Sequence, residues 1–199
     1  MTGLRSWEAL PDRALAGAGP EAAALLRRGM RDYRAAARFV CELPYGRNAD
    51  RADYRLVLRE GRGTCSTKHA LLAAIAEEEA LPVSLRIGIY DMDEGNTPGV
   101  GPVLAAHGLA SLPEAHCYLA YRGLRVDVTR SGVSSSGRVR FHAEWCIRPE
   151  QIGDHKVSLH RAFLRDWLGR QPDLGLDLET LWRVREACIA ALAETASGR

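Results

Sequence analysis

The stretch from Gly61 to Leu72 constrains this chain most. Two glycines and a threonine precede Cys65, and an apolar run from Ala70 to Ala76 follows without a break. This pattern predicts a loop that closes onto a buried helix, with Cys65 in its first turn. The N–H groups of a first turn lack intrahelical partners and carry positive potential. A thiol placed there ionises below its ordinary pKa of about 8.5, so the stretch predicts a reactive cysteine.

The composition is that of an ordinary globular domain. The chain has 199 residues, a hydrophobic fraction of 46%, a charged fraction of 26% and a net charge of +2. These values favour one domain with a substantial core and give no argument for a nucleic-acid or anionic-membrane partner. No apolar run reaches the roughly 20 residues that a membrane helix needs. The basic residues are nearly all arginine, and Lys68 and Lys156 are the only lysines.

The amino-terminal segment and the cysteines indicate a cytoplasmic protein. Residues 1–15 lack the apolar middle of a signal peptide. The cysteines are five in number and irregularly spaced, which favours free thiols in a reducing compartment over a disulfide framework. Residues 1–19 carry few large apolar groups and are expected to form a loosely ordered arm. Residues 20–199 are expected to form a single domain.

Hydrophobic periodicity predicts helices at both ends of the domain and strands between them. The expected helices are 20–43, 65–80, 103–109, 155–169 and 178–195, with a long polar loop at 45–60. The expected strands are 83–90, 115–121, 124–129 and 139–147, with a Ser/Gly turn at 131–137. Helices followed by mostly antiparallel strands and then by helices suit an α+β fold.

Arg122-Gly123 suits a two-residue hairpin turn. Such a turn sets Tyr121 opposite Leu124 and puts His116 and Asp127 on the same face of the sheet. The two side chains become diagonal neighbours, about 7–8 Å apart, which lets a carboxylate reach an imidazole N–H. The opposite face then collects apolar side chains, which supports this register: Cys117, Leu119, Tyr121, Leu124, Val126 and Val128.

A polar sheet face with a histidine and an aspartate, packed near a helix that begins with a cysteine, is typical of an activated nucleophile. In this scheme Cys65 attacks a carbonyl carbon. His116 takes the thiol proton and later protonates the leaving amine. Asp127 holds the imidazole in the useful tautomer and stabilises its cation. The backbone N–H of Cys65 serves as one oxyanion donor.

These residues resemble the motifs of the transglutaminase-like superfamily, which has the papain-like cysteine-protease architecture. Gly63-Thr64-Cys65 matches the Gly-x-Cys at the start of that family's central helix. His116-Cys117-Tyr118 matches its His strand, with tyrosine where the family usually has tryptophan. Asp127-Val128-Thr129 resembles its common Asp-Pro-Thr. The resemblance covers roughly residues 40–130 and implies a central Cys-bearing helix packed on an antiparallel sheet, with flanking N- and C-terminal helices.

The resemblance implies thiol-dependent acyl transfer or amide hydrolysis by a Cys-His-Asp triad, without a cofactor. The expected partner is a small-molecule, peptide or amide substrate. Hydrolysis is favoured over protein cross-linking because the chain lacks obvious accessory domains. Arylamine N-acetyltransferases share this architecture, and Arg62-Gly63-Thr64-Cys65 partly matches their Arg-Gly-Gly-x-Cys, so an acyltransferase remains an alternative. A non-catalytic binding module is another, because Arg59 and Glu60 stand where a Trp or Gln oxyanion donor is expected.

Three residues near the predicted triad are candidates for substrate binding. Tyr118 and Arg125 share the sheet face of the His-Asp pair, and Arg62 lies just ahead of the nucleophile. His69, one turn after Cys65, is expected to be a supporting or core residue. Lys68 is expected to be a surface lysine, with a role in lowering the thiol pKa or binding a substrate carboxylate as the alternative.

The remaining cysteines and tryptophans are assigned to the core, and a zinc site is weighed as an alternative. The core assignments are Cys117, Cys146, Cys188, Trp145, Trp167 and Trp182. Cys65, His69, His116 and Cys146 could be proposed as zinc ligands. No Cys-x-x-Cys or His-x-x-x-His pair supports such a site, so no metal is expected.

Overall fold

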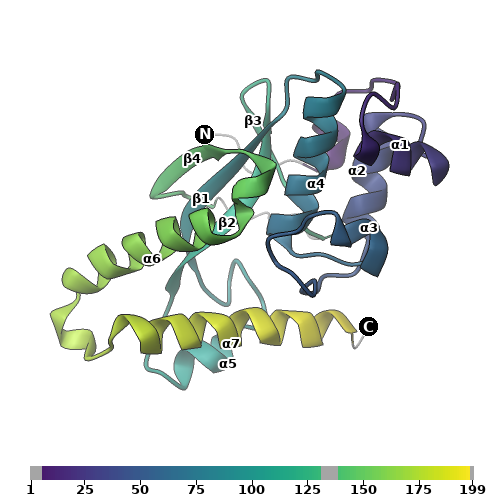
Figure 1. Ribbon diagram of the computed structural model, residues 1–199. Helices are drawn as coiled ribbons and strands as arrows, with labels where there is room; N and C mark the ends of the chain where they lie inside the picture. Colours follow the sequence, from purple (N-terminus) through teal and green to yellow (C-terminus); the bar gives the residue numbers. More distant parts are fainter. Residues whose placement is uncertain (1–5, 131–138, 198–199) are drawn as a thin grey trace.

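The computed structural model describes residues 6–130 and 139–197 and has an α+β fold (Figure 1). The helices in this part of the chain are α1 (Pro20–Arg27), α2 (Tyr33–Glu42), α3 (Leu56–Glu60), α4 (Cys65–Glu78), α5 (Gly101–Ala105), α6 (Asp154–Gly169) and α7 (Leu178–Ser197). The strands are β1 (Ser84–Met92), β2 (Leu112–Tyr121), β3 (Leu124–Val126) and β4 (Ala143–Ile147). Short 3₁₀ turns lie at Trp7–Ala9, Pro149–Ile152 and Pro172–Leu174.

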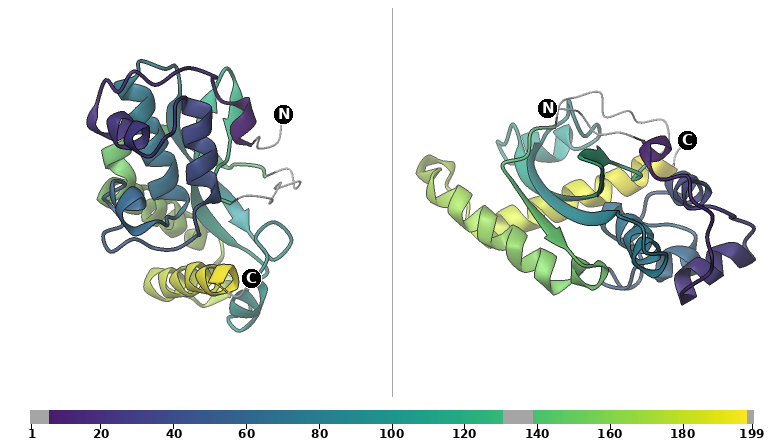
Figure 2. Two further views of the ribbon diagram at one scale, coloured as in Figure 1. Left: turned by 90° about the vertical axis from the view of Figure 1, so that its right-hand side faces the viewer. Right: turned by 90° about the horizontal axis from the view of Figure 1, so that it is seen from above.

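Helix α4 is the centre of the fold. It lies between the sheet and the layer formed by α1, α2 and α3 (Figures 1 and 2). Every residue from Ser66 to Ala76 is buried, as expected for a helix that is surrounded on all sides. The helix begins at Cys65 because Thr64 caps it, and the Thr67 hydroxyl accepts the Thr64 N–H at 3.0 Å. The predicted central helix is therefore confirmed.

The strands form one antiparallel sheet in the order β3-β2-β1-β4. The predicted two-residue turn is confirmed, because Tyr121 pairs with Leu124 and both turn residues have positive φ, 48° at Arg122 and 75° at Gly123. The predicted apolar face packs toward α4 and is buried except for Leu124, which is half-buried. β4 pairs with β1 on the far side, in the register Ile87 to Trp145.

The carboxy-terminal helices build a second apolar cluster beside the first. α6 contacts β2, and α7 contacts both α6 and α5 (Figure 1). This cluster includes Leu104, Leu164, Leu181, Val184 and Cys188, all fully buried. The site described below lies beside this second cluster, because its apolar lining from β1 and α7 belongs to the cluster or packs against it.

The amino-terminal region differs from the sequence prediction in two ways. The expected helix over 20–43 is two helices, because Gly29 has a φ of 89° and Asp32 caps a new start by accepting the Ala35 N–H at 2.7 Å. Residues 6–19, predicted as a loosely ordered arm, pack against the body through buried Leu10 and Leu15. The carboxylate of Glu79 accepts three backbone N–H groups of this segment. Residues 1–5 lie outside the described part.

The carboxy-terminal half follows the predicted order with adjusted ends. The loop over 45–60 contains the short helix α3, and the strand expected at 139–147 begins at Ala143. The turn expected at 131–137 lies outside the described residues. Cys117 and Cys188 are buried as predicted, but Cys146 is exposed, because it lies on the solvent face of edge strand β4. The three assigned tryptophans are only partly buried.

No helix within residues 6–130 or 139–197 combines the length and the apolar character that crossing a bilayer requires.

Candidate active site

Cys65 is the first residue of α4 and carries a half-buried free thiol. The loop before Cys65 passes close to the first turn of α4. A Cβ added at Gly63 would lie 2.9 Å from Lys68 Cγ and from Thr67 Oγ1. Glycine is therefore the residue that lets this backbone pass so close to the helix start. The first-turn N–H groups place the sulfur where negative charge is favoured.

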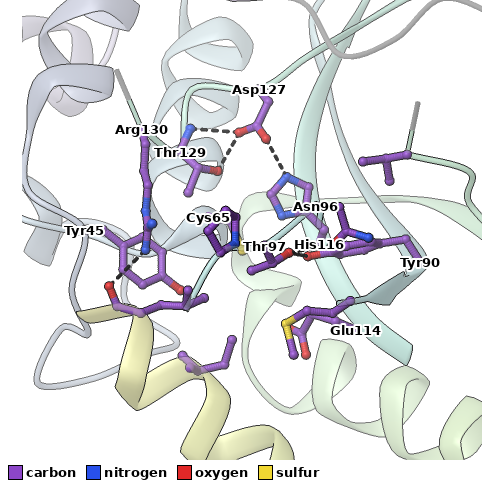
Figure 3. Close-up of a pocket in the computed structure, with 15 residues that line it drawn as sticks. Tyr45, Cys65, Tyr90, Asn96, Thr97, Glu114, His116, Asp127, Thr129 and Arg130 are labelled. Atoms are coloured by element: carbon purple, nitrogen blue, oxygen red, sulfur yellow. Dashed lines mark hydrogen bonds and ion pairs between the residues drawn. The ribbon is translucent and has the colours of Figure 1, made fainter. Parts of the chain in front are cut away.

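His116 on β2 lines the same pocket as Cys65 and Asp127 (Figure 3). Its Nε2 donates a hydrogen bond to Asp127 Oδ2 at 2.9 Å. The Cys65 thiol lines the same pocket, and its charge interacts favourably with that of His116. Asp127 Oδ1 accepts the backbone N–H of Thr129 at 2.8 Å and its hydroxyl at 2.5 Å. Both carboxylate oxygens are thus held, and the imidazole orientation is set.

The charges in this group favour a thiolate paired with an imidazolium. Burial raises the pKa of Cys65, but Lys156, His116 and the backbone N–H of Cys117 outweigh it and lower that pKa to about 6. Burial lowers the pKa of His116, while Asp127 and Cys65 raise it, and the result lies well above the ordinary value. Burial raises the pKa of Asp127, but the lowering by His116 is larger. The pKa of this carboxyl therefore lies well below its ordinary value, and the carboxyl is charged.

His69, also on α4, links the backbone of Cys65 to the backbone of Val128, next to Asp127. Its Nδ1 donates to the carbonyl oxygen of Cys65 at 2.7 Å, and its Nε2 accepts the backbone N–H of Val128 at 2.8 Å. Because Nε2 accepts, the ring is neutral. Burial lowers its pKa to about 4, which agrees with that state. The predicted supporting role is therefore matched by these contacts.

Lys68 is fully buried and not at the surface, which corrects the sequence prediction. Its ammonium donates to the carbonyl oxygens of Cys41, Leu43 and Thr129, at 3.3, 2.5 and 2.9 Å. Burial lowers its pKa to about 8. The three carbonyls come from α2, from the loop after it and from the segment after β3, so Lys68 ties these segments to α4.

Lys156 is the functional candidate that the sequence reasoning missed. It comes from α6 and is 6% exposed, and its Nζ donates to Ser66 Oγ at 2.6 Å, one residue from the nucleophile. Burial lowers its pKa, but Cys117, Cys65 and Glu114 raise it above the ordinary value. The one available signal was composition, because this chain uses lysine only twice.

Two pockets meet at Cys65. They hold about 830 Å³ and 590 Å³ when the space open to solvent is counted, which suits small ligand groups. The first contains the triad and is walled by aromatic and aliphatic side chains (Figure 3), among them Tyr45, Tyr90, Met92, Pro98, Ile189 and Leu192. The second lies toward α6 and α7, and the charged side chains that line it are basic except for Glu114.

The three residues predicted to bind substrate lie outside both pockets. Tyr118 is buried and stacks on Phe141, with ring centroids 5.2 Å apart. Arg125 pairs with Glu144, and both line a separate hollow with Tyr118. Arg62 lies near Glu60, with 3.6 Å between Nε and Oε2. For Tyr118 and Arg125, a shared sheet face with His116 was not enough to place the side chain in the pocket. Each step of two residues along a strand moves a side chain nearly 7 Å farther from the cysteine.

The described residues give no support for the alternative of a zinc site. Within residues 6–130 and 139–197, no three histidine, cysteine or acidic side chains form a group that could hold a metal ion. Cys146 lies on exposed strand β4, away from Cys65 and His116.

Comparisons of the chain with family models, with curated proteins and with solved structures found no match. The function is therefore inferred from the residues of the site.

Proposed function

We propose that the protein is a thiol-dependent hydrolase or acyltransferase that uses Cys65, His116 and Asp127. The observation that carries this proposal is the position of His116, which donates to Asp127 at 2.9 Å and lines the same pocket as Cys65, where the charges of His116 and Cys65 stabilise each other. A nucleophile, its base and an orienting acid in direct contact are the requirement for covalent acyl chemistry.

The proposed reaction begins with attack of the Cys65 thiolate on the carbonyl carbon of an amide or a related acyl donor. The oxygen of the tetrahedral intermediate takes the negative charge, and the backbone N–H at the start of α4 stabilises it. The His116 imidazolium gives its proton to the leaving amine, which yields a thioester on Cys65 and a neutral imidazole. His116 then takes a proton from the water or amine that attacks the thioester, and the C–S bond breaks to release Cys65 as a thiolate beside the restored imidazolium.

The fold-level part of the proposal is a transglutaminase-like core. It is supported by the order of the elements, since a buried helix that begins with the cysteine is followed by an antiparallel sheet in which β2 bears the histidine. The aspartate comes directly after β3, one residue beyond its last paired position. This order agrees with the motifs that the resemblance named.

The open cleft favours an enzyme over a binding module without activity. A module that had lost catalysis would tolerate a closed cleft or a thiol remote from the histidine. Cys65 instead borders both pockets and shares the first of them with His116, which lowers the pKa of the thiol.

The proposal is tested with an activated acyl donor, p-nitrophenyl acetate. Release of p-nitrophenolate is followed, and the acetylated residue is mapped by mass spectrometry. We expect acetylation at Cys65, little or none of it in Cys65→Ser, and a much slower reaction in His116→Ala. The exposed Cys146 is an internal reference. Acetylation that falls on Cys146 and spares Cys65 would contradict the proposal and favour the binding module.

A further inference from the structure

The second pocket has an excess of positive charge beside the nucleophile. Its ionisable lining consists of Arg47, Arg51, Lys156 and Arg185, with Glu114 as the one carboxylate and His160 held neutral by burial, which lowers its pKa to about 4. The first pocket is walled mainly by aromatic and aliphatic groups. Cys65 and Glu114 border both pockets, so a substrate carbonyl at the sulfur has an apolar space on one side and a basic space on the other.

The carboxylates near the second pocket are already engaged by arginines. Arg185 donates to both oxygens of Glu114, at 2.7 and 2.6 Å. Glu186 accepts from Arg47 at 2.7 Å and from Arg185 at 2.8 Å. No carboxylate in the described residues forms a hydrogen bond or an ion pair with Lys156. The ammonium of Lys156 thus lies buried without a carboxylate in direct contact, although the charges of Cys117, Cys65 and Glu114 favour its protonated form.

Lys68 shows what a fully satisfied buried lysine looks like in this protein. Its three donors have three carbonyl acceptors. Lys156 has the same three donors but, within the described part of the chain, one hydrogen-bond partner, the Ser66 hydroxyl. Two N–H groups therefore remain for a molecule in the second pocket. A carboxylate that accepts from these buried donors forms charge-assisted hydrogen bonds, which are stronger than neutral ones.

We propose that the second pocket binds a carboxylate of the substrate, with Lys156 as its inner ligand. The inference rests on the proposed function and adds a substrate class to it, an acyl compound with an apolar group on one side of the reacting carbonyl and a carboxylate on the other. The two unused donors of Lys156 suit the two oxygens of a carboxylate. The basic rim residues Arg47 and Arg51 attract such a substrate to the pocket.

The test compares two alkylating reagents of similar size, anionic iodoacetate and neutral iodoacetamide, at Cys65. We expect iodoacetate to be favoured at Cys65 relative to the exposed Cys146 in the same molecule. Lys156→Met keeps the length of the side chain and removes its charge, and we expect it to lower the iodoacetate-to-iodoacetamide rate ratio about tenfold or more. The control Arg62→Gln, which alters an arginine outside both pockets, leaves the ratio unchanged.

If Lys156→Met fails to fold, a measurement on the wild-type protein still tests the proposal. Propionate is expected to protect Cys65 from iodoacetamide, and the isosteric propionamide is expected not to protect it. Equal protection by both compounds would overturn the proposal. So would an equal loss of both alkylation rates in Lys156→Met, because the lysine would then only stabilise the thiolate. A Cys65 that reacts no faster than Cys146 with either reagent would instead count against the proposed function itself.

Discussion

The imidazole of His69 joins the backbone of Cys65 to the backbone of Val128. It donates to the Cys65 carbonyl oxygen at 2.7 Å and accepts the Val128 N–H at 2.8 Å. Val128 directly follows Asp127, so one buried ring sets the spacing between the nucleophile and the acid of the proposed triad. Its Nε2 also lies 3.5 Å from Asp127 Oδ1, but the ring is neutral and does not compete with His116 for that charge.

Replacement of His69 is predicted to affect both stability and reactivity. His69→Leu leaves the buried Val128 N–H without its acceptor, which costs about 1–3 kcal/mol in the free energy of unfolding. It also loosens the Asp127 segment, so Cys65 alkylation near pH 6.5 should slow. The measurements are urea unfolding and the iodoacetamide rate. Tyr33→Phe is the control, because it removes a buried hydrogen bond to Leu72 of the same helix, at 2.9 Å, away from the pockets. An alkylation rate in His69→Leu that matches this control would contradict the linking role.

Replacement of Asp127 tests how much the charge on the carboxylate matters. Asp127→Asn keeps the shape but presents an amide to Nε2 of His116, which disfavours the imidazolium and the useful tautomer. We expect the rate of p-nitrophenolate release from p-nitrophenyl acetate to fall roughly 10²–10⁴-fold. Asp91→Asn is the matched control, since Asp91 forms an equally short pair with the exposed His142, 2.9 Å, outside both pockets. Equal activity in the two variants would show that Asp127 has no part in the reaction.

The hairpin and the His-Asp pair were predictable because they depend on local rules. A two-residue turn and a strict alternation fix which residues face each other, and His116 and Asp127 meet through that register. The start of α4 was predictable for the same reason, since Thr64 and the following apolar run are adjacent in sequence.

The basic pocket was not predictable, because its parts are far apart in the chain. Lys156 reaches Ser66 across 90 positions, and Arg185 reaches Glu114 across 71. Periodicity says which face of a helix is apolar but not which charged residue the packing encloses. The same limit explains why the burial of Lys68 was not predicted, since it depends on three distant carbonyl groups. It also explains the ordered amino-terminal segment, whose backbone N–H groups bind Glu79, 61 to 63 positions away.

A side chain at position 63 is predicted to lower the stability of the protein. A Cβ there would meet Lys68 Cγ, Thr67 Oγ1 and Val57 Cγ2 at 2.9 to 3.0 Å, and these groups are packed and hydrogen-bonded. Gly63→Ala should lower the free energy of unfolding by about 1–3 kcal/mol. Gly169→Ala is the control, because nothing lies within 4 Å of its added Cβ, and its effect should be neutral or stabilising. Urea unfolding of both variants distinguishes them, and equal stabilities would contradict the close packing at Gly63.

The Glu114–Arg185 pair is predicted to make stability depend on acid pH. Burial raises the pKa of Glu114, but Arg185 outweighs it and lowers the value to about 2. Because the folded-state pKa lies below the unfolded value of about 4.3, the pair contributes about 3 kcal/mol above pH 5, and this is lost as the pH falls toward 2.

Arg185→Met removes that contribution and leaves a buried carboxylate, so we expect a loss of about 3–5 kcal/mol at pH 7 that shrinks as the pH falls. Arg125→Met breaks the more exposed pair with Glu144 and should cost less than about 1 kcal/mol. Urea unfolding between pH 3 and 7 measures both. A loss in Arg185→Met that stays constant over this range would contradict the assigned charge on Glu114.

The most direct test of the proposed triad is the pH dependence of Cys65 alkylation by iodoacetamide, in wild type and His116→Ala, with the site mapped by mass spectrometry. Only the thiolate reacts, so the profile reports the pKa of Cys65. A pKa of about 6 predicts a midpoint near pH 6 in the wild type. Loss of the His116 charge should move it upward toward the ordinary thiol value of about 8.5. A wild-type midpoint above pH 8, or one that His116→Ala leaves in place, would contradict a thiolate–imidazolium pair at this site.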